Sequence, residues 1–167
     1  ETVLPVSSEV LNKRVLPAGA LVVVLHTCEF AEGNAAARAC TKAAIRVLSS
    51  NDEVGVLDYD IQSGDMWVIP MQKVGDKEAH YKTLDSAEPS DMPSLQSIVQ
   101  MAWEGLAKST AAVKHMIIIS DGDPAMPDDK LAANVTADRI SISTVLVNPH
   151  SRGNAENAMR RLAEANG

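Results

Sequence analysis

The chain has 167 residues, the size of a single domain, and 46% of them are hydrophobic, which is enough for a packed core. It carries 22 acidic against 15 basic side chains, and this net charge of -7 argues against a surface for nucleic acid or anionic membrane. The longest apolar run, 20–25, is far shorter than the roughly 20 residues of a membrane-spanning helix.

Apolar runs alternate with helical spacings along the chain, after an extended N-terminal segment at 1–18. The run at 20–25 and the run at 115–119 are typical of strands buried on both faces. Further strands are expected at 54–57, 66–69 and 140–147, and helices at 34–49, 77–84, 94–107, 130–137 and 154–165. The short Gly64-Asp65 turn predicts that 54–57 and 66–69 pair antiparallel. The alternation predicts an α/β fold with a mostly parallel sheet, one antiparallel edge strand and helices on both faces.

The helix expected at 34–49 has apolar side chains at the i, i+3, i+4 spacing of a single buried stripe. We assign to that stripe Ala36, Cys40, Ala43, Ala44, Val47 and Leu48. Cys40 is therefore interpreted as a packing residue. Together with Cys28 it makes two cysteines, which are too few for a disulfide framework.

Parallel sheets bind ligands beyond the carboxyl ends of their strands, where the strand order reverses. Polar segments follow both apolar strands at that point, and a loop with another carboxylate precedes the helix at 94–107. We predict a ligand or partner face made of His26, Thr27, Cys28, Glu29, Phe30, Asp91, Met92, Asp121, Gly122 and Asp123.

Much of the excess negative charge falls in the loops expected at the same end of the sheet. The acidic residues there are Glu29, Glu32, Glu88, Asp91, Asp121, Asp123, Asp128 and Asp129. Such a local concentration of carboxylates suits a cation or a basic partner.

Four segments carry a family resemblance: the first strand with its polar exit, Asp-Glu-Val-Gly-Val at 52–56, Trp-Val-Ile-Pro at 67–70 and Lys-His-Met-Ile-Ile-Ile-Ser-Asp-Gly at 114–122. In this order they make nearly the whole chain resemble a von Willebrand factor type A (vWA) domain. The nearest resemblance is to a bacterial subgroup within larger membrane-associated proteins, some with a glutamine-amidotransferase-like region. The resemblance implies a Rossmann-like fold that binds a protein ligand through a metal.

The resemblance also bears on the boundaries of the domain. The chain begins at Glu1 without an initiator Met, so we expect one vWA-like domain, 1–167, from a longer bacterial protein that is membrane-associated. Family members continue past the last helix into a further edge strand, which we expect to be missing here. We therefore predict that a neighbouring chain or the N-terminal segment covers the edge of 140–147.

The family's metal site, carried over position by position, is degenerate in this sequence. Its Asp falls on His26, its two Ser residues on Cys28 and Phe30, its Thr within 91–93, and its last Asp on Asp121. Only Asp121 matches. Because Mg²⁺ requires hard oxygen ligands, we expect no conventional Mg²⁺ site and no resident cofactor.

Three interpretations of this position remain open. In the first, which we favour, His26 hydrogen-bonds neighbouring loops with Asp121 or Asp91 as acceptor, and the domain binds a protein partner without metal. In the second, His26, Cys28, Asp121 and Asp91 hold Zn²⁺ or a similar metal. In the third, Cys28 is a catalytic nucleophile near a helix N-terminus. The expected partners are a basic protein and the rest of the parent chain, with no nucleic acid and no direct membrane contact.

Overall fold

The structure is a computed structural model that describes residues 17–26, 31–87, 90–122, 124–147, 149 and 152–167. Its five strands are β1 (Gly19–Leu25), β2 (Glu53–Asp60), β3 (Gly64–Lys73), β4 (Val113–Ser120) and β5 (Ile140–Leu146). Its helices are α2 (Ala31–Val47), α3 (Lys77–Ser86), α4 (Gln96–Lys108), α5 (Asp129–Ala137) and α6 (Arg152–Ala165). Each expected element is present, with ends displaced by a few residues.

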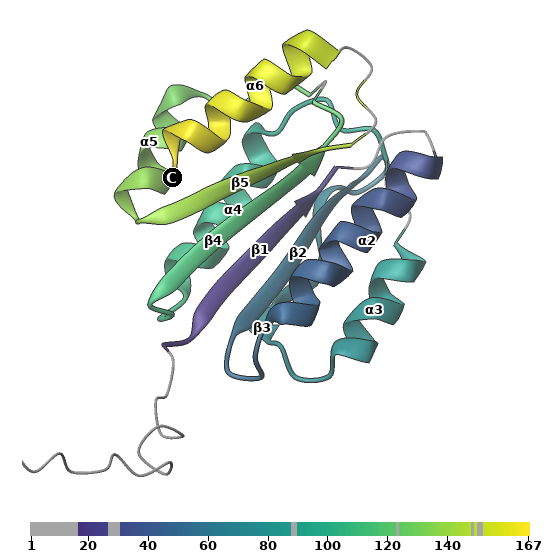
Figure 1. The fold of residues 1–167 in the computed structure, drawn as a ribbon, viewed down its shortest axis with the longest axis vertical. Helices are drawn as coiled ribbons and strands as arrows, with labels where there is room; N and C mark the ends of the chain where they lie inside the picture. The colour runs from purple at the N-terminus through teal and green to yellow at the C-terminus, as the bar shows by residue number, and fades with distance from the viewer. Residues whose placement is uncertain (1–16, 27–30, 88–89, 123, 148, 150–151) are drawn as a thin grey trace, which may run out of the picture.

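The strands form one sheet in the order β3-β2-β1-β4-β5 (Figure 1). β1 pairs parallel with both β2 and β4, β4 pairs parallel with β5, and β2 pairs antiparallel with β3. The chain therefore builds the sheet outward from β1 in one direction and then, from β4, in the other. This reversal lies between β1 and β4, where the segments that follow both strands meet.

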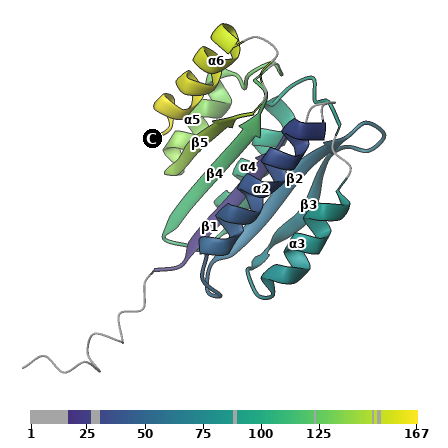
Figure 2. The ribbon, with the colours of Figure 1, turned by 45° about the vertical axis from the view of Figure 1, so that its right-hand side comes forward.

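Two apolar cores lie on opposite faces of the sheet (Figures 1 and 2). On one face, α2 and α3 pack against β1 and β2 through residues such as Ile45 and Leu84. On the other face, α4, α5 and α6 pack through residues such as Ile98, Leu131 and Met159. Helices on both faces and a mostly parallel sheet confirm the expected fold class.

The buried side of α2 differs from the predicted stripe. Its buried positions are Ala37, Thr41 and Ile45, whereas Cys40 is exposed and Val47 is 79% exposed. The interpretation of Cys40 as a packing residue is therefore wrong. The hydroxyl of Thr41 donates to the Ala37 carbonyl at 2.9 Å, so this polar side chain is satisfied within its own helix.

β4 is less completely buried than the sequence predicts. Met116 and Ile118 of β4 are buried, but His115 and Ile117, on the opposite face, are only partly buried. β5 is the edge strand of the sheet, and its Ile142 N–H donates to the Asn166 carbonyl at 3.3 Å. Coverage of this edge by a neighbouring chain or by 1–18 stays a prediction, because residues 1–16 lie outside the described part of the chain.

Two glycines make room for Trp67 of β3. A Cβ atom at Gly55 of β2 would lie 2.6 Å from Trp67 Cζ3 and 2.8 Å from Met71 Sδ. A Cβ atom at Gly105 of α4 would lie 2.9 Å from Trp67 Cη2. The indole ring is thus enclosed by backbone from a strand and a helix, which accounts for a glycine in the middle of each.

We expect Gly55→Ala to destabilise the domain by about 1–3 kcal/mol, because the added methyl group overpacks against Trp67 and Met71. Urea unfolding followed by circular dichroism measures the change. Gly19→Ala is the matched control, since its Cβ would meet nothing closer than Asp52 Oδ1 at 3.5 Å. Equal unfolding midpoints for the two variants would contradict the packing argument.

Candidate functional site

His26 directly follows β1 and is fully buried at the carboxyl edge of the sheet. Its N–H donates to the Ile119 carbonyl at 2.9 Å, which continues the pairing of β1 with β4. Its ring Nε2 lies 3.3 Å from the backbone N–H of Met92, and its Nδ1 lies 2.8 Å from Ser120 Oγ. Because a backbone N–H can only donate, Nε2 accepts, and the ring proton is assigned to Nδ1, which donates to the serine.

Two carboxylates flank the imidazole. Asp121 Oδ1 lies 3.3 Å from Nδ1, and this side chain is 1% exposed. Asp91 Oδ1 lies 3.5 Å from Nε2, and its side chain is 64% exposed. Asp121 is thus buried beside the ring nitrogen that donates to Ser120, whereas the exposed carboxylate of Asp91 remains available to an external ligand.

The turn after β4 depends on Gly122. Its N–H donates to Ser120 Oγ at 3.0 Å, and its φ of 83° lies in the left-handed region that favours glycine. A Cβ atom there would also lie 2.6 Å from Ala155 Cβ of α6. The turn is therefore closed from both sides, by its own serine and by the helix packed on it.

Main-chain hydrogen bonds join the loop before α4 to the segment that precedes α5. Leu95 N–H donates to the Ala125 carbonyl at 2.8 Å, and Ala125 N–H donates to the Pro93 carbonyl at 3.1 Å. With the ring of His26 bonded to Met92 and Ser120, segments after β1, before α4 and after β4 are all held together.

The sequence matches no family model. It also matches no curated protein. Solved structures resemble it at low identity. An aerotolerance-related membrane protein from Bacteroides fragilis is 12% identical, with a TM-score of 0.66 over 89% of this chain and 88% of its own. A von Willebrand factor type A protein from Catenulispora acidiphila is 14% identical, with a TM-score of 0.68 over 90% of this chain and 37% of its own.

This chain has the vWA fold. Another similar structure is proximal thread matrix protein 1 of the mussel byssus with a zinc-occupied MIDAS motif, 13% identical, with a TM-score of 0.69 over 88% of this chain and 41% of its own. At these identities the likeness describes the architecture alone. None of the helices in the described residues is both long and apolar enough to span a membrane.

The vWA fold brings four of the predicted face residues together: His26, Asp91, Met92 and Asp121, with Gly122 next in the chain. Their exposure differs from the expectation of a shared outer surface. Met92 and Asp121 are 1% exposed and His26 is fully buried, so only Asp91 offers its side chain to a partner. Thr27, Cys28, Glu29, Phe30 and Asp123 lie outside the described residues.

The acidic residues predicted at this end of the sheet also differ in where the structure places them. Asp128 and Asp129 are exposed at the start of α5, where the Asp128 carboxylate accepts the Leu131 N–H at 2.7 Å as an N-cap. Glu29, Glu88, Asp123 and the side chain of Glu32 lie outside the described part. Within that part, no three His, Cys, Asp or Glu side chains are grouped to hold a metal ion.

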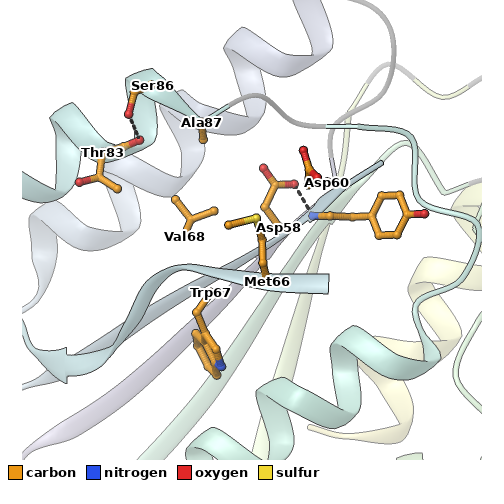
Figure 3. A pocket seen from close by; sticks show the side chains of 9 residues that line it. Asp58, Asp60, Met66, Trp67, Val68, Thr83, Ser86 and Ala87 are labelled. Atoms are coloured by element: carbon orange, nitrogen blue, oxygen red, sulfur yellow. Dashed lines mark hydrogen bonds between the residues drawn. The ribbon is translucent and has the colours of Figure 1, made fainter. Parts of the chain in front are cut away.

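Asp58 is a buried polar residue that no sequence pattern indicated, and it lies beside Leu25 in the pairing of β2 with β1. It is 3% exposed and lines a cavity of about 400 Å³ between β3 and the end of α3 (Figure 3). Burial raises the pKa of this carboxyl to about 7, against the lowering effect of the Tyr59 N–H and the Arg38 guanidinium. The strand predicted at 54–57 ended one residue too early to include it.

We expect Asp58→Asn to stabilise the domain by on the order of 2–4 kcal/mol at pH 8, with little effect at pH 4.5. The raised pKa means that the unfolded chain ionises first as the pH rises from about 4 to 7, so wild-type stability falls across that window and stays low above it. The asparagine oxygen can still accept the Tyr59 N–H. Urea unfolding at a series of pH values measures the difference between the two proteins.

Asp60→Asn is the matched control. Hydrogen bonds from the Ser63 and Gln62 N–H groups lower the pKa of Asp60, so its carboxylate contributes stability at neutral pH that is lost on acidification. The control should therefore be less stable than wild type at pH 8. Parallel stability profiles for Asp58→Asn and wild type would show that Asp58 is not strained by burial.

Proposed function

We propose that this vWA domain is a protein-interaction module whose partner face is the loop cluster at the carboxyl ends of β1 and β4, and that it binds no Mg²⁺ in the usual way of the family. The observation that carries the proposal is the engagement of both His26 nitrogens by Ser120 and Met92. His26 stands where the resemblance places a metal-binding aspartate, and there it joins the loops directly.

The donor set also disfavours Mg²⁺. This ion takes oxygen ligands in near-octahedral geometry, and an imidazole in place of a carboxylate removes one of them. The Asp121 carboxylate that remains is buried against the ring N–H side of His26. An ion at this position would have to displace hydrogen bonds that already satisfy buried groups, at a desolvation cost.

We propose a basic partner. Asp91, Asp128 and Asp129 are exposed around this end of the sheet, and carboxylates so placed attract positive charge and set its orientation. An aerotolerance-related membrane protein and a byssal thread matrix protein share the fold, which supports an assembly role and a membrane-associated parent protein. We propose no enzymatic activity for the domain.

Mg²⁺ or Mn²⁺ at up to millimolar concentration should leave the melting temperature of the domain unchanged. Any ion that binds the native state selectively stabilises it by mass action, so a bound ion would be visible as a rise in melting temperature. Differential scanning calorimetry with chelator-treated protein measures this. A reproducible rise with Mg²⁺ would overturn the metal-free part of the proposal.

Charge reversal at the face should abolish partner binding. Asp91→Lys is expected to reduce carbodiimide crosslinking to the partner in an extract of the native organism at least tenfold, because it removes the exposed carboxylate beside His26. Glu78→Lys is the control, since Glu78 is exposed in the first turn of α3, where Lys77 donates to the Arg46 carbonyl near the end of α2 and so at the end of the sheet opposite to the face. Quantitative mass spectrometry compares the two. An equal loss, or none, would place the partner elsewhere.

A transition-metal site is the second candidate, favoured by the approach of Asp91 and Asp121 to His26 within 3.5 Å. Imidazole and carboxylates, with the Cys28 thiolate, would suit Zn²⁺. Elemental analysis of freshly purified protein decides it. Near-stoichiometric zinc that disappears in His26→Ala would replace the metal-free proposal.

A nucleophilic Cys28 would be revealed by its reactivity. The exposed Cys40 is a suitable internal standard, because it reports the labelling rate of an accessible thiol. If Cys28 were activated, iodoacetamide at neutral pH would label it much faster than Cys40. Labelling no faster than that of Cys40 rules out this alternative.

A further inference from the structure

A second polar site lies at the same end of the sheet, on the face covered by α2 and α3. The cavity of about 400 Å³ beside β2 and β3 is within the size range of small-ligand sites. Its lining residues include Asp58, Asp60, Met66, Val68, Thr83 and Ser86. In Figure 3 Trp67 points to the opposite side of β3, in agreement with its packing against α4.

Asp58 is the buried charged group of this cavity. One of its carboxylate oxygens accepts the Tyr59 N–H at 2.7 Å, and the other has no hydrogen-bond partner among the described residues. Figure 3 shows this carboxyl group on the side of the sheet where Ser86 and Ala87 lie. The Arg38 guanidinium donates to the Ala87 carbonyl at 3.3 Å and forms no ion pair with Asp58. The second carboxylate oxygen of a residue that is only 3% exposed is thus left for a ligand.

The Thr83 and Ser86 hydroxyls that line the cavity can only accept. The Thr83 hydroxyl donates to the Ala79 carbonyl at 3.1 Å, and the Ser86 hydroxyl donates to the Thr83 carbonyl at 2.9 Å. Each hydroxyl proton is therefore used within α3, and only lone pairs remain. Asp60 adds a second carboxylate, one oxygen of which accepts two backbone N–H groups. Such a site favours a ligand that donates and carries positive charge.

Part of the lining is apolar, because it includes Met66 and Val68 of β3. An alkyl chain could pack there while its charged end reaches Asp58, as lysine side chains do on other proteins. A guanidinium prefers two parallel carboxylate oxygens, and Asp58 offers one. A compact ammonium group with three donors fits a single carboxylate oxygen and hydroxyl lone pairs better.

We propose that this cavity binds a primary alkylammonium group, presented as a lysine side chain of a protein partner. The proposal does not rest on the function proposed for the loop face, since it uses none of the same side chains. Both sites open at the carboxyl end of the sheet, because Asp58 pairs with Leu25, the residue before His26. One basic partner could therefore occupy both.

Binding should strengthen as the pH rises from 6 to 8. The charged groups that act on Asp58 are the Arg38 guanidinium from α2 and the Asp60 carboxylate of β2. From α3 and β3 the cavity receives hydroxyl and apolar groups. Because burial raises the pKa of Asp58 to about 7, the carboxylate that attracts an ammonium group forms across this interval.

The test is an NMR titration of the ¹⁵N-labelled protein with Nα-acetyl-lysine methylamide. We expect saturable shifts of the Tyr59, Met66 and Ala87 amide signals, none with the uncharged norleucine analogue, and at least tenfold weaker binding to Asp58→Asn. Asp60→Asn should weaken binding by a smaller factor. Equal binding of the norleucine analogue, or unchanged binding to Asp58→Asn, would overturn the proposal.

A second titration distinguishes binding of a lysine side chain of a protein from binding of a free amine. Cadaverine carries the same alkylammonium group without a peptide backbone. Saturable shifts with cadaverine but none with the lysine amide would assign the site to a small amine and refute the partner lysine. If no lysine binding is detected, the crosslinking result expected for Asp91→Lys is unaffected. The lysine site and the partner face are therefore tested independently.

Discussion

The burial of β1 on both faces is the constraint on which the rest of this domain depends. Val22, Val23 and Val24 have no exposed surface, and both edges of the strand are paired in parallel. Because both faces of β1 are buried and both of its edges are paired, the point and the direction in which the chain leaves the sheet are fixed. His26 follows at that point, with its N–H still paired to β4, and its ring therefore meets the loops from α4 and β4.

The chemistry at this point follows from the cost of burying polar groups. Asp121 is almost fully buried, and a carboxylate in that environment requires a donor. The imidazole of His26 lies beside it, with Nδ1 3.3 Å from Asp121 Oδ1, and the ring's other nitrogen accepts from Met92. A buried network in which each member has a partner stiffens the loops around it. The described loops at this end of the sheet are therefore held in a defined shape by the chain's own contacts.

The sequence predicted the elements, the antiparallel pair and the meeting of His26 with Asp91 and Asp121, because apolar runs and topology determine these features. It mispredicted the buried side of α2, since alanines lie all around that helix and the spacing alone could not select Ile45 and Thr41. Nor could it distinguish the buried Asp121 from the exposed Asp91. Burial of a loop carboxylate depends on packing from distant elements, and α6 packs against Gly122, the residue after Asp121.

Asp58 and Asp121, on either side of β1, are both carboxyl groups that the fold buries. Their surroundings differ. Both carboxylates are almost fully buried at the carboxyl edge of the sheet. Asp121 has the imidazole as a neighbour, whereas Asp58 has a single backbone N–H and a cavity. A carboxylate whose donors come from the chain gains little from an external cation. One that lacks them is unstable when ionised and gains most from a cation, so the energetic advantage of cation binding at this end of the sheet lies at Asp58.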